Sequence, residues 1–383
     1  MIPLKIIFWI LISVQLYLYF IYPGIITLVA KLKRKEKGSY TETFEPEVSI
    51  IITVRNEERV IEDKIKNTLQ LEYPKEKLEI IVVSDHSTDK TDEIVKKYKE
   101  DGVHLIKLSK RLGKTEAQNL AAKQAKGKIL VFSDANAMYK SDAIKYLIRH
   151  FEDSEVGCVS GELCYFIPDE SIVGREENLY WRYEKFIKKQ EARTGYLLGA
   201  NGSIYAVRKS DYVLLEPDTI SDFIEPLEIA NKKRKVVYES KALSYEDASM
   251  SFNVEFVRRR RIVSRSIRSL IVHSELLNPF KTGMLAVELL SHKLLRWISP
   301  FFLILLFVVN GLLALWTTYC MIFYIQIGFY ILGSVGLIFK DCKKIPVWIF
   351  IPYYFCLLNY GSLLGVIDFL RGKTITVWEP VRS

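Results

Sequence analysis

Apolar stretches long enough to cross a lipid bilayer lie at both ends of this sequence. Residues 4–30 are nearly all apolar or aromatic, and a basic cluster follows them at residues 31–37. A transmembrane helix needs about 20 apolar residues, and basic flanks stay on the cytoplasmic side. We therefore expect a transmembrane helix over residues 1–30 with its N-terminus outside, followed by a basic and polar linker over residues 31–46.

Three more apolar segments lie near the C-terminus, at about 297–317, 320–339 and 345–370. Together they define a transmembrane region over residues 297–371, and residues 372–383 form a tail. Four spans in total place this tail outside the cell, whereas the positive charges of Arg371 and Lys373 favour the inside. Either the last segment is re-entrant or one apolar stretch is not a full span.

The segment that precedes these spans is amphipathic. Residues 270–296 lead into the sequence HKLLRW (292–297), which combines basic and apolar side chains. This pattern is typical of a helix that lies in the membrane interface with its basic side at the lipid headgroups.

The amino-acid composition indicates that the chain also contains a part outside the membrane. Of the 383 residues, 49% are hydrophobic and 26% are charged, which indicates one part in water and one part in lipid. A net charge of +9 favours phosphate-bearing ligands or anionic lipid, and no nucleic-acid-binding motif is present. The five cysteines form no CxxC pair, so neither a disulfide framework nor a zinc site is indicated.

The middle of the chain alternates between apolar runs and helical patterns. Runs of four to seven apolar residues bounded by polar turns are typical of buried strands, and alternation with helices predicts a parallel sheet covered on both faces. The expected strands are VSIIITV (48–54), LEIIVVSD (78–85), VHLIKL (103–108) and ILVFSDAN (129–136), and the expected helices between them include 55–73 and 115–127.

Polar residues follow each of these strands at its carboxyl end. Ligands of open α/β sheets bind at that edge, so we expect one cleft there. Asp134 and Asn136 offer two oxygen-bearing side chains, which suit Mg²⁺ or Mn²⁺, although Asp134 could instead cap the following helix. The residues concerned are Arg55, Asn56, Glu57, Asp85, Arg111, Gly113, Lys114, Asp134 and Asn136.

Four segments resemble, in the same order, the nucleotide-sugar domain of family 2 glycosyltransferases. They are VSIIITVRNEE, VVSDHSTDKT, RLGKTEAQN and FSDAN, and with later motifs the resemblance covers residues 48–265. The closest likeness is to the membrane-bound branch with cellulose, hyaluronan and poly-N-acetylglucosamine synthases. It implies an α/β GT-A fold, a Rossmann-like mixed sheet with helices on both faces, over a cytoplasmic domain at residues 47–269, joined to α-helical transmembrane segments.

The resemblance also implies roles for residues at the strand ends. Asn56, Glu57 and Asp85 would hold the base and ribose of the donor. Asp134 and Asn136 stand at the DxD position, where the last residue binds the metal, here with a neutral amide in place of a carboxylate. The sequence GKT at 113–115 is no Walker A motif, because Leu108 stands where that motif needs glycine. From the residues alone, Lys114 could still bind a phosphate or an acidic group, with a solvated loop lysine as an equal alternative.

The acceptor half of the domain is expected over residues 150–216. A strand pair is expected at 157–166 and an amphipathic helix at 175–195. The loop LLGANGSIYAVRK (197–209) follows, and in the family it lies beside the acceptor sugar. The residues of this loop that would contact the acceptor are Gly199, Asn201 and Gly202.

The next carboxylate of interest is Asp222. The tripeptide Ser221-Asp222-Phe223 matches the TED or SDD position of the family, with Asp222 as its last acid. Displacement at an anomeric carbon needs a base for the acceptor hydroxyl, and Asp222 is the predicted base. Asp222 could instead be the N-cap of a helix at 223–231, and Glu225, one turn further, is the fallback base.

The strongest charge run is EFVRRRRIVSRSIRS (255–269). The family carries a Q-x-x-R-W motif here, and Arg258, Arg261 and Ile262 occupy the Q, R and W positions. Arg261 would pair with the donor diphosphate, and Arg258 would lie beside it. The alternative is a face exposed to water or lipid headgroups. The missing Gln and Trp leave processivity open.

Together these features predict a multi-pass protein of the cell membrane with a cytoplasmic catalytic domain. The predicted activity is that of an inverting glycosyltransferase that uses a nucleotide-diphosphate sugar, UDP-linked, with Mg²⁺ or Mn²⁺, and a polysaccharide or lipid-linked glycan as acceptor. A polyprenyl-phosphate sugar synthase and a catalytically silent membrane scaffold are the alternatives. The donor sugar, the linkage and assembly into a homo-oligomer stay open.

Overall fold

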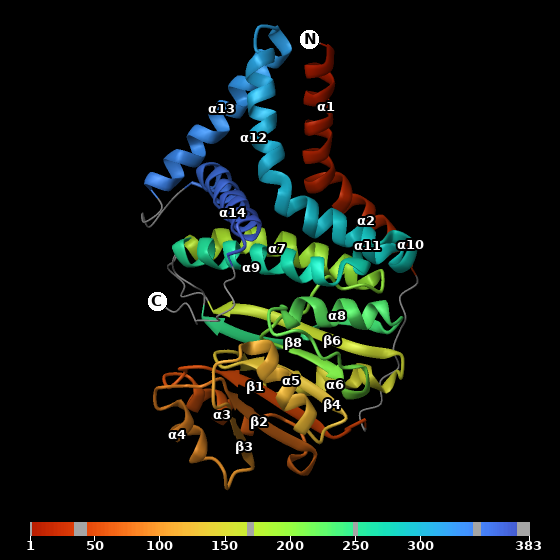
Figure 1. Cartoon of the computed structure of the whole chain (residues 1–383), viewed down its shortest axis with the longest axis vertical. Coiled ribbons are helices and arrows are strands. Elements are labelled where there is room, and N and C mark those ends of the chain that lie inside the picture. The colour runs from red at the N-terminus through yellow and green to blue at the C-terminus, as the bar shows by residue number, and fades with distance from the viewer. Residues whose placement is uncertain (1, 34–43, 167–171, 248–251, 340–345, 374–383) are drawn as a thin grey trace.

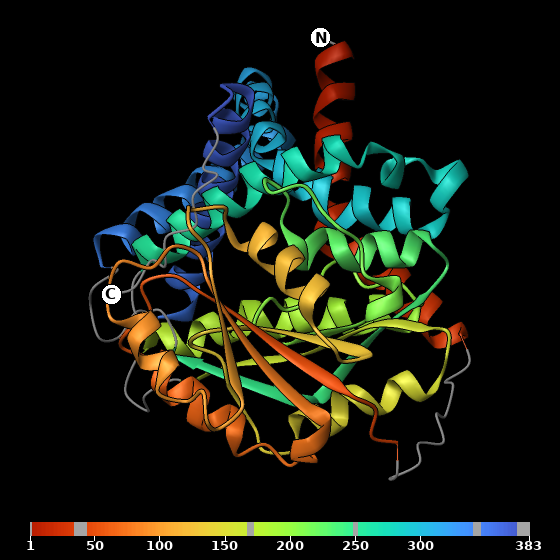
Figure 2. The ribbon, with the colours of Figure 1, turned by 60° about the horizontal axis from the view of Figure 1, so that its bottom comes forward.

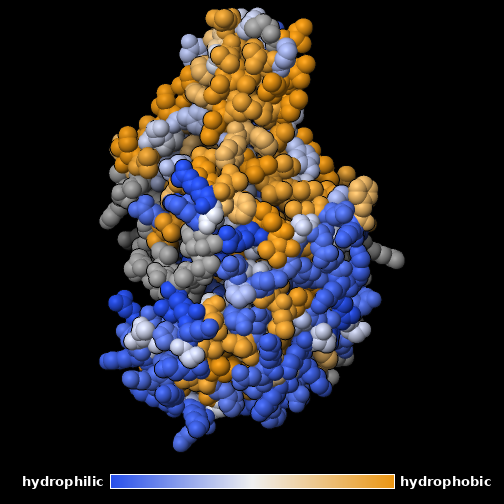
Figure 3. Space-filling view, in the orientation of Figure 1, coloured by the Kyte–Doolittle hydropathy of each residue, from blue (hydrophilic) through white to orange (hydrophobic). Residues whose placement is uncertain are grey.

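The protein is described here from a computed structural model, which covers residues 2–33, 44–166, 172–247, 252–339 and 346–373. Figure 1 shows three layers. Apolar helices stand at one end, a pair of long helices lies beneath them, and a sheet with its own helices forms the other end. Figure 3 shows that the surface is hydrophobic over the first layer and mostly hydrophilic around the sheet.

Over the described ranges the sheet has eight strands, in the order β3-β2-β1-β4-β7-β6-β8-β5. The first four are parallel, whereas β7 runs antiparallel to both β4 and β6. The mixed α/β fold is therefore confirmed. The strands are β1 (Val48–Val54), β2 (Leu78–Ser84), β3 (Val103–Lys107), β4 (Ile129–Asp134), β5 (Met138–Tyr139), β6 (Val156–Phe166), β7 (Tyr205–Arg208) and β8 (Lys235–Asp247).

Helices cover both faces of this sheet, as Figure 2 shows. Alternate residues of β1 point to opposite faces, so Ile51 packs with helices α5 and α8, and Ile50 and Ile52 pack with α3 and α6. Because both faces are covered, the central strands β1 and β4 are buried along almost their whole length. The helices are α3 (Ile61–Leu69), α4 (Thr91–Lys96), α5 (Lys114–Gln124), α6 (Ala143–Ile148) and α8 (Ser221–Asn231).

Two local predictions were wrong, and one long strand was missed. The helix expected over 55–73 begins only at Ile61, because Asn56 adopts a left-handed backbone (φ 51°) and a turn fills the first residues. The expected strand pair at 157–166 is the single strand β6. Strand β8 was not predicted, because its lysine and glutamate residues break the apolar pattern.

Among the residues that the structure describes, four helical stretches are long and apolar enough to cross a membrane: 2–32, 284–313, 317–338 and 347–370. The first bends at a π-helical segment, Tyr17–Ile21, and the second contains another, Leu289–Leu294. The helices are α1 (Ile2–Leu16), α2 (Tyr22–Leu32), α11 (Met284–Glu288), α12 (Leu295–Leu313), α13 (Thr317–Ile338) and α14 (Val347–Leu370), with the short helix α10 (Pro279–Thr282) before α11.

Helix α14 packs against α9 (Phe252–Val272) as well as against α12 and α13, and Figure 1 shows it almost end-on. At Gly365 the two backbones approach so closely that an added Cβ would lie 2.7 Å from the carbonyl oxygen of Arg260. Arg260 also forms a two-pronged ion pair with the buried Asp368. The carboxyl end of α14 is thus attached to α9.

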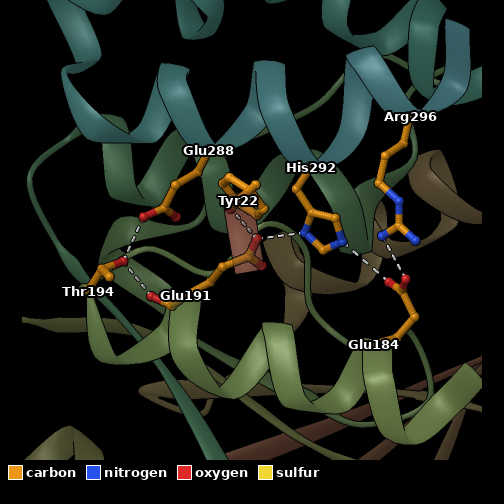
Figure 4. Close-up of polar contacts among 7 residues, drawn as sticks. All are labelled: Tyr22, Glu184, Glu191, Thr194, Glu288, His292 and Arg296. Atoms are coloured by element: carbon orange, nitrogen blue, oxygen red, sulfur yellow. Dashed lines mark hydrogen bonds and ion pairs between the residues drawn. The ribbon is translucent and has the colours of Figure 1, made fainter. Parts of the chain in front are cut away.

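A buried polar network joins the apolar helices to α7 (Ile172–Arg193), as Figure 4 shows. The Nδ1 atom of His292 lies 2.6 Å from Glu191, whose other partner is the Tyr22 hydroxyl at 2.7 Å. Arg296 donates to Glu184 over 2.7 Å. The prediction that HKLLRW directs its basic side to lipid headgroups is therefore wrong for His292 and Arg296, which are 4% and 8% exposed.

We expect Glu184→Gln to loosen this junction. Burial opposes ionisation of Glu184, but Arg296 and His292 outweigh it and hold its pKa well below the ordinary value. Removing one partner of a buried ion pair costs about 3 kcal/mol, so thermal unfolding in detergent should begin at a lower temperature. The pKa of Glu184 is lower in the folded state than in the unfolded state. Its contribution to stability is therefore present at pH values above the ordinary pKa of glutamate, and it is lost as the pH falls through the lower folded-state pKa.

The control for this variant is Glu76→Gln, which changes an exposed glutamate on the sheet domain. Equal unfolding temperatures for Glu184→Gln and Glu76→Gln at neutral pH would show that the Glu184–Arg296 pair does not stabilise the junction.

Candidate active site

Three elements bring charged side chains together at the carboxyl edge of the parallel strands. Asp134 ends β4, Lys114 begins α5, and Asp222 is the second residue of α8. The Lys114 ammonium pairs with Asp134. A Cβ added to Gly202 would lie 2.7 Å from Oδ2 of Asp222 and 3.4 Å from Nζ of Lys114. These four residues therefore line one space.

The charges in this space influence one another strongly. Burial raises the pKa of Asp222; Lys114 opposes this rise and Asp134 adds to it. Burial works against the charged form of Lys114, but Asp134 and Asp222 together raise its pKa. One ammonium therefore balances two carboxylates, and Lys114 stays a cation at neutral pH.

Helix α9 directs three arginines toward the same space. Arg258, Arg261 and Arg265 are spaced i, i+3 and i+7, which places them on one face of a helix. Arg261 interacts electrostatically with Asp134 and Asp222, and Arg265 interacts with Asp222. Burial and neighbouring arginines lower the pKa of Arg261. Arg265 was not predicted, although its helical spacing from Arg261 could have identified it.

Glu246 on β8 is a further member of the cluster that was not predicted. Its carboxylate forms a hydrogen bond with the side chain of Asn136. Burial, with a smaller contribution from Asp134, raises the pKa of Glu246 to about 7, against the attraction of Arg258 and Lys114. Glu246 was not predicted because strand β8 was not predicted. Nothing else in the sequence places residue 246 beside residue 136.

The residues expected to hold the base and ribose lie at the ends of β1 and β2. Asp85 accepts hydrogen bonds from the backbone of Leu112 at 2.7 Å and Gly113 at 3.0 Å. It thereby fixes the loop immediately before Lys114. Asn56 accepts from the Thr88 backbone at 2.8 Å, and the Glu57 backbone donates to Thr91 at 2.8 Å. These side chains tie neighbouring strand ends together.

The predicted acceptor loop lies directly against Asp222. The backbone N–H of Ala200 donates to the carbonyl oxygen of Asp222 over 2.7 Å. Asn201 accepts a hydrogen bond of 2.7 Å from Lys188 of α7, and an added Cβ on Gly199 would lie 3.6 Å from the Asp222 carbonyl oxygen. The predicted acceptor loop therefore borders Asp222 along its length. Gly199 and Gly202 lie against Asp222 themselves, and Asn201 follows Ala200, which bonds it.

Glu225 does not reach this space, so the fallback base is wrong. It is fully buried and accepts a hydrogen bond of 2.7 Å from the backbone of Val213. Burial raises its pKa to about 8, and its electrostatic partners include Tyr205 and Tyr212 in the core. Asp222 itself is not the N-cap of α8, which begins one residue earlier at Ser221.

The oxygen atoms beside Lys114 suit a hard divalent cation. Within the described ranges, no group of three or more His, Cys, Asp and Glu side chains is arranged as a metal site. Asp134 and Asn136 nevertheless offer a carboxylate and an amide oxygen, and Asp134 repels both Asp222 and Glu246. A divalent cation would relieve this repulsion, so the donor set fits the predicted Mg²⁺ or Mn²⁺.

We expect Gly202→Ala to impair the site without unfolding the chain. The new Cβ would collide with the Asp222 carboxylate, so this carboxylate must move. A displacement of about 1 Å can reduce the rate of a positioned reaction by up to about 100-fold. Product formation with saturating donor measures this. The control is Gly328→Ala, where nothing lies within 4 Å; equal rates would contradict the predicted crowding.

Comparison with known proteins gives a match to the family model described as glycosyl transferase family 2, over residues 49–213. A poly-beta-1,6-N-acetyl-D-glucosamine synthase of Staphylococcus aureus is 31% identical over 169 residues, which are 43% of this chain and 40% of the synthase. The chain thus matches less than half the length of this curated relative.

One solved structure is similar over almost the whole chain. It is a mannosyltransferase of Pyrobaculum calidifontis in complex with GDP-Man and Mn²⁺, with a TM-score of 0.70 and 19% sequence identity. The match covers 96% of this chain and 99% of that one. At this identity the likeness concerns the fold alone.

Proposed function

We propose that this chain, which carries a family 2 glycosyltransferase domain over residues 49–213, transfers a sugar from a nucleotide-diphosphate sugar to a glycan hydroxyl at a membrane surface. One observation supports this most: Asp134, Lys114 and Asp222 line one space into which α9 directs its arginines. Such a space can hold a diphosphate on one side and a nucleophile on the other.

The donor diphosphate would be held by positive charge from two elements. Lys114 stands at the first residue of α5, where helix N–H groups also favour anions, and Arg258 and Arg261 approach from α9. Asp134 and Asn136 would hold the divalent cation, which supplies stabilisation for the negative charge that develops on the leaving diphosphate. Asn56, Glu57 and Asp85 would hold the nucleoside at the neighbouring strand ends.

Asp222 would take the proton of the acceptor hydroxyl. Its raised pKa makes its carboxylate a stronger base than an exposed aspartate, and it adjoins the loop that carries Asn201 and Gly202. Attack from the face opposite the diphosphate inverts the anomeric centre, so an α-linked donor gives a β-linked product. Lys188, which bonds Asn201, would orient the acceptor side of this space.

The membrane assignment rests on the four apolar helical stretches. We propose a multi-pass protein of the cell membrane with residues 47–269 as a cytoplasmic enzyme domain. The attachment of α14 to α9 supports a C-terminal tail on the same side as that domain.

The test is a panel of UDP- and GDP-sugars given to the full chain in lipid nanodiscs with Mg²⁺, Mn²⁺ or EDTA. We expect metal-dependent nucleotide release with one donor, with a UDP-sugar as the first candidate, and faster release when a glycan acceptor is added. Absence of release with every donor and acceptor would support the silent scaffold instead. A product with a single, acid-labile sugar on a polyprenyl phosphate would identify the sugar synthase alternative.

A further inference from the structure

A cavity of about 490 Å³ lies between the apolar helices and the two long helices beneath them. Its wall is mostly aromatic and aliphatic, with Tyr354, Phe355 and Leu358 of α14 on one side and Tyr19 and Tyr183 on the other. This volume is within the usual range for small-molecule sites, roughly 300–1,000 Å³. The cavity is separate from the space around Asp222, and the proposed function does not use it.

Two arginines contribute the positive charge of this cavity. Arg296 is paired with Glu184. Arg259 differs: its Nε donates to Ser362 over 3.2 Å, and among the described residues no carboxylate forms an ion pair with it. Lys293 lies close enough to interact repulsively with both arginines. An aromatic cavity that contains a guanidinium without a carboxylate partner is suited to an anion attached to a hydrocarbon chain.

The cavity lies near the candidate active site. Helix α7 carries Tyr183 at the cavity, and Lys188, little more than one turn further, bonds Asn201 beside Asp222. Trp297, next to Arg296, contacts the ring of Phe223 with centroids 5.9 Å apart. Helix α9 connects the two sites as well, because Arg258 faces the cluster and the adjacent Arg259 faces the cavity.

We propose that this cavity binds the phosphate and the first part of the chain of a single-chain lipid phosphate that carries the acceptor sugar. The phosphate would lie on Arg259, the chain would lie among Tyr354, Phe355 and Leu358 and continue into the bilayer, and the sugar would extend toward Asn201 and Asp222. This rests on the proposed function and specifies its acceptor as a lipid-linked glycan.

The test measures binding of farnesyl phosphate to the full chain in phosphatidylcholine nanodiscs. We expect Arg259→Gln to weaken binding about tenfold or more, because a charge-assisted hydrogen bond is lost. Arg268→Gln, which removes the same charge from an outer position of α9 where Arg268 pairs with Asp218, should bind as the unchanged chain does. Farnesol and inorganic phosphate should each bind more weakly than farnesyl phosphate.

A second variant keeps both arginines and fills the cavity. Asn359→Trp adds an indole to a lining position and should also abolish farnesyl phosphate binding, with nucleotide binding retained as evidence of folding. Equal binding by Arg259→Gln and Arg268→Gln would overturn the proposal. So would displacement of farnesyl phosphate by phosphatidylglycerol at the same concentration, since the cavity would then be a general site for anionic lipid.

Failure of this inference can be distinguished from failure of the proposed function. If the chain hydrolyses or transfers from a nucleotide sugar but does not bind farnesyl phosphate, the lipid site is wrong and the enzyme assignment stands. If it binds farnesyl phosphate through Arg259 but neither binds nor consumes any nucleotide sugar, the proposed function is wrong.

Discussion

Replacing Asp222 by asparagine is expected to reduce sugar transfer by roughly 10²–10⁴-fold, the usual contribution of a positioned general base. The amide keeps the shape of the carboxylate but cannot accept the proton of the acceptor hydroxyl. Donor affinity should change little, because Lys114 keeps its ion pair with Asp134. Single-turnover transfer at saturating donor measures the first effect, and nucleotide binding measures the second.

Asp218→Asn is the matched control for this substitution. It makes the same change four residues earlier, where the side chain is 50% exposed and pairs with Arg268. Normal transfer by Asp222→Asn with normal donor binding would reject Asp222 as the base. Loss of donor binding in both variants would instead indicate that the segment before α8 has unfolded.

Replacing Asp134 by asparagine is the second change with a large expected effect. It removes the one carboxylate of the Asp134–Asn136 pair and leaves two neutral amides for a divalent cation. Since a metal ion contributes several kcal/mol to stabilising a leaving diphosphate, we expect nucleotide release to fall by about 10²–10³-fold at a fixed, moderate Mn²⁺ concentration. Excess Mn²⁺ should restore part of the loss.

A titration of nucleotide release against Mn²⁺ and Mg²⁺ checks this prediction. Asp63→Asn, an exposed aspartate in the first turn of α3, is the control and should follow the curve of the unchanged chain. A superimposable metal titration for Asp134→Asn would show that Asp134 does not bind the cation. Asp134→Asn also removes the ion pair between Asp134 and Lys114. Donor binding in the absence of metal should therefore be measured separately, so that this loss is distinguished from the loss of metal binding.

Much of the sheet could be predicted because its central strands are locally unambiguous. The apolar runs that form β1, β2 and β4 are bounded by polar turns, and their parallel arrangement brings Asp85, Lys114 and Asp134 to one edge. The sequence could not identify β8, since that strand alternates charged and apolar residues and is only partly buried. Glu246 was therefore absent from the predicted site.

Two other differences arise from contacts between distant segments. Glu225 and Asp222 are one turn apart on α8, but only the first turn of this helix borders the site. The second turn is covered by the segment at Val213, whose backbone N–H bonds Glu225. His292 and Glu184 are 108 positions apart, and nothing in either local pattern indicates that they meet. A basic amphipathic helix has the same sequence pattern whether its charges face lipid headgroups or a buried glutamate.

The sequence by itself determined which segments are apolar enough for strands or membrane helices, and which polar residues follow the parallel strands, because these properties depend on neighbours along the chain. The tertiary structure decided which polar side chains meet: Lys114 with Asp134, Asn136 with Glu246, and Arg296 with Glu184. The physical reason is that electrostatic and hydrogen-bond energies depend on distances between side chains from different elements, and packing alone sets those distances.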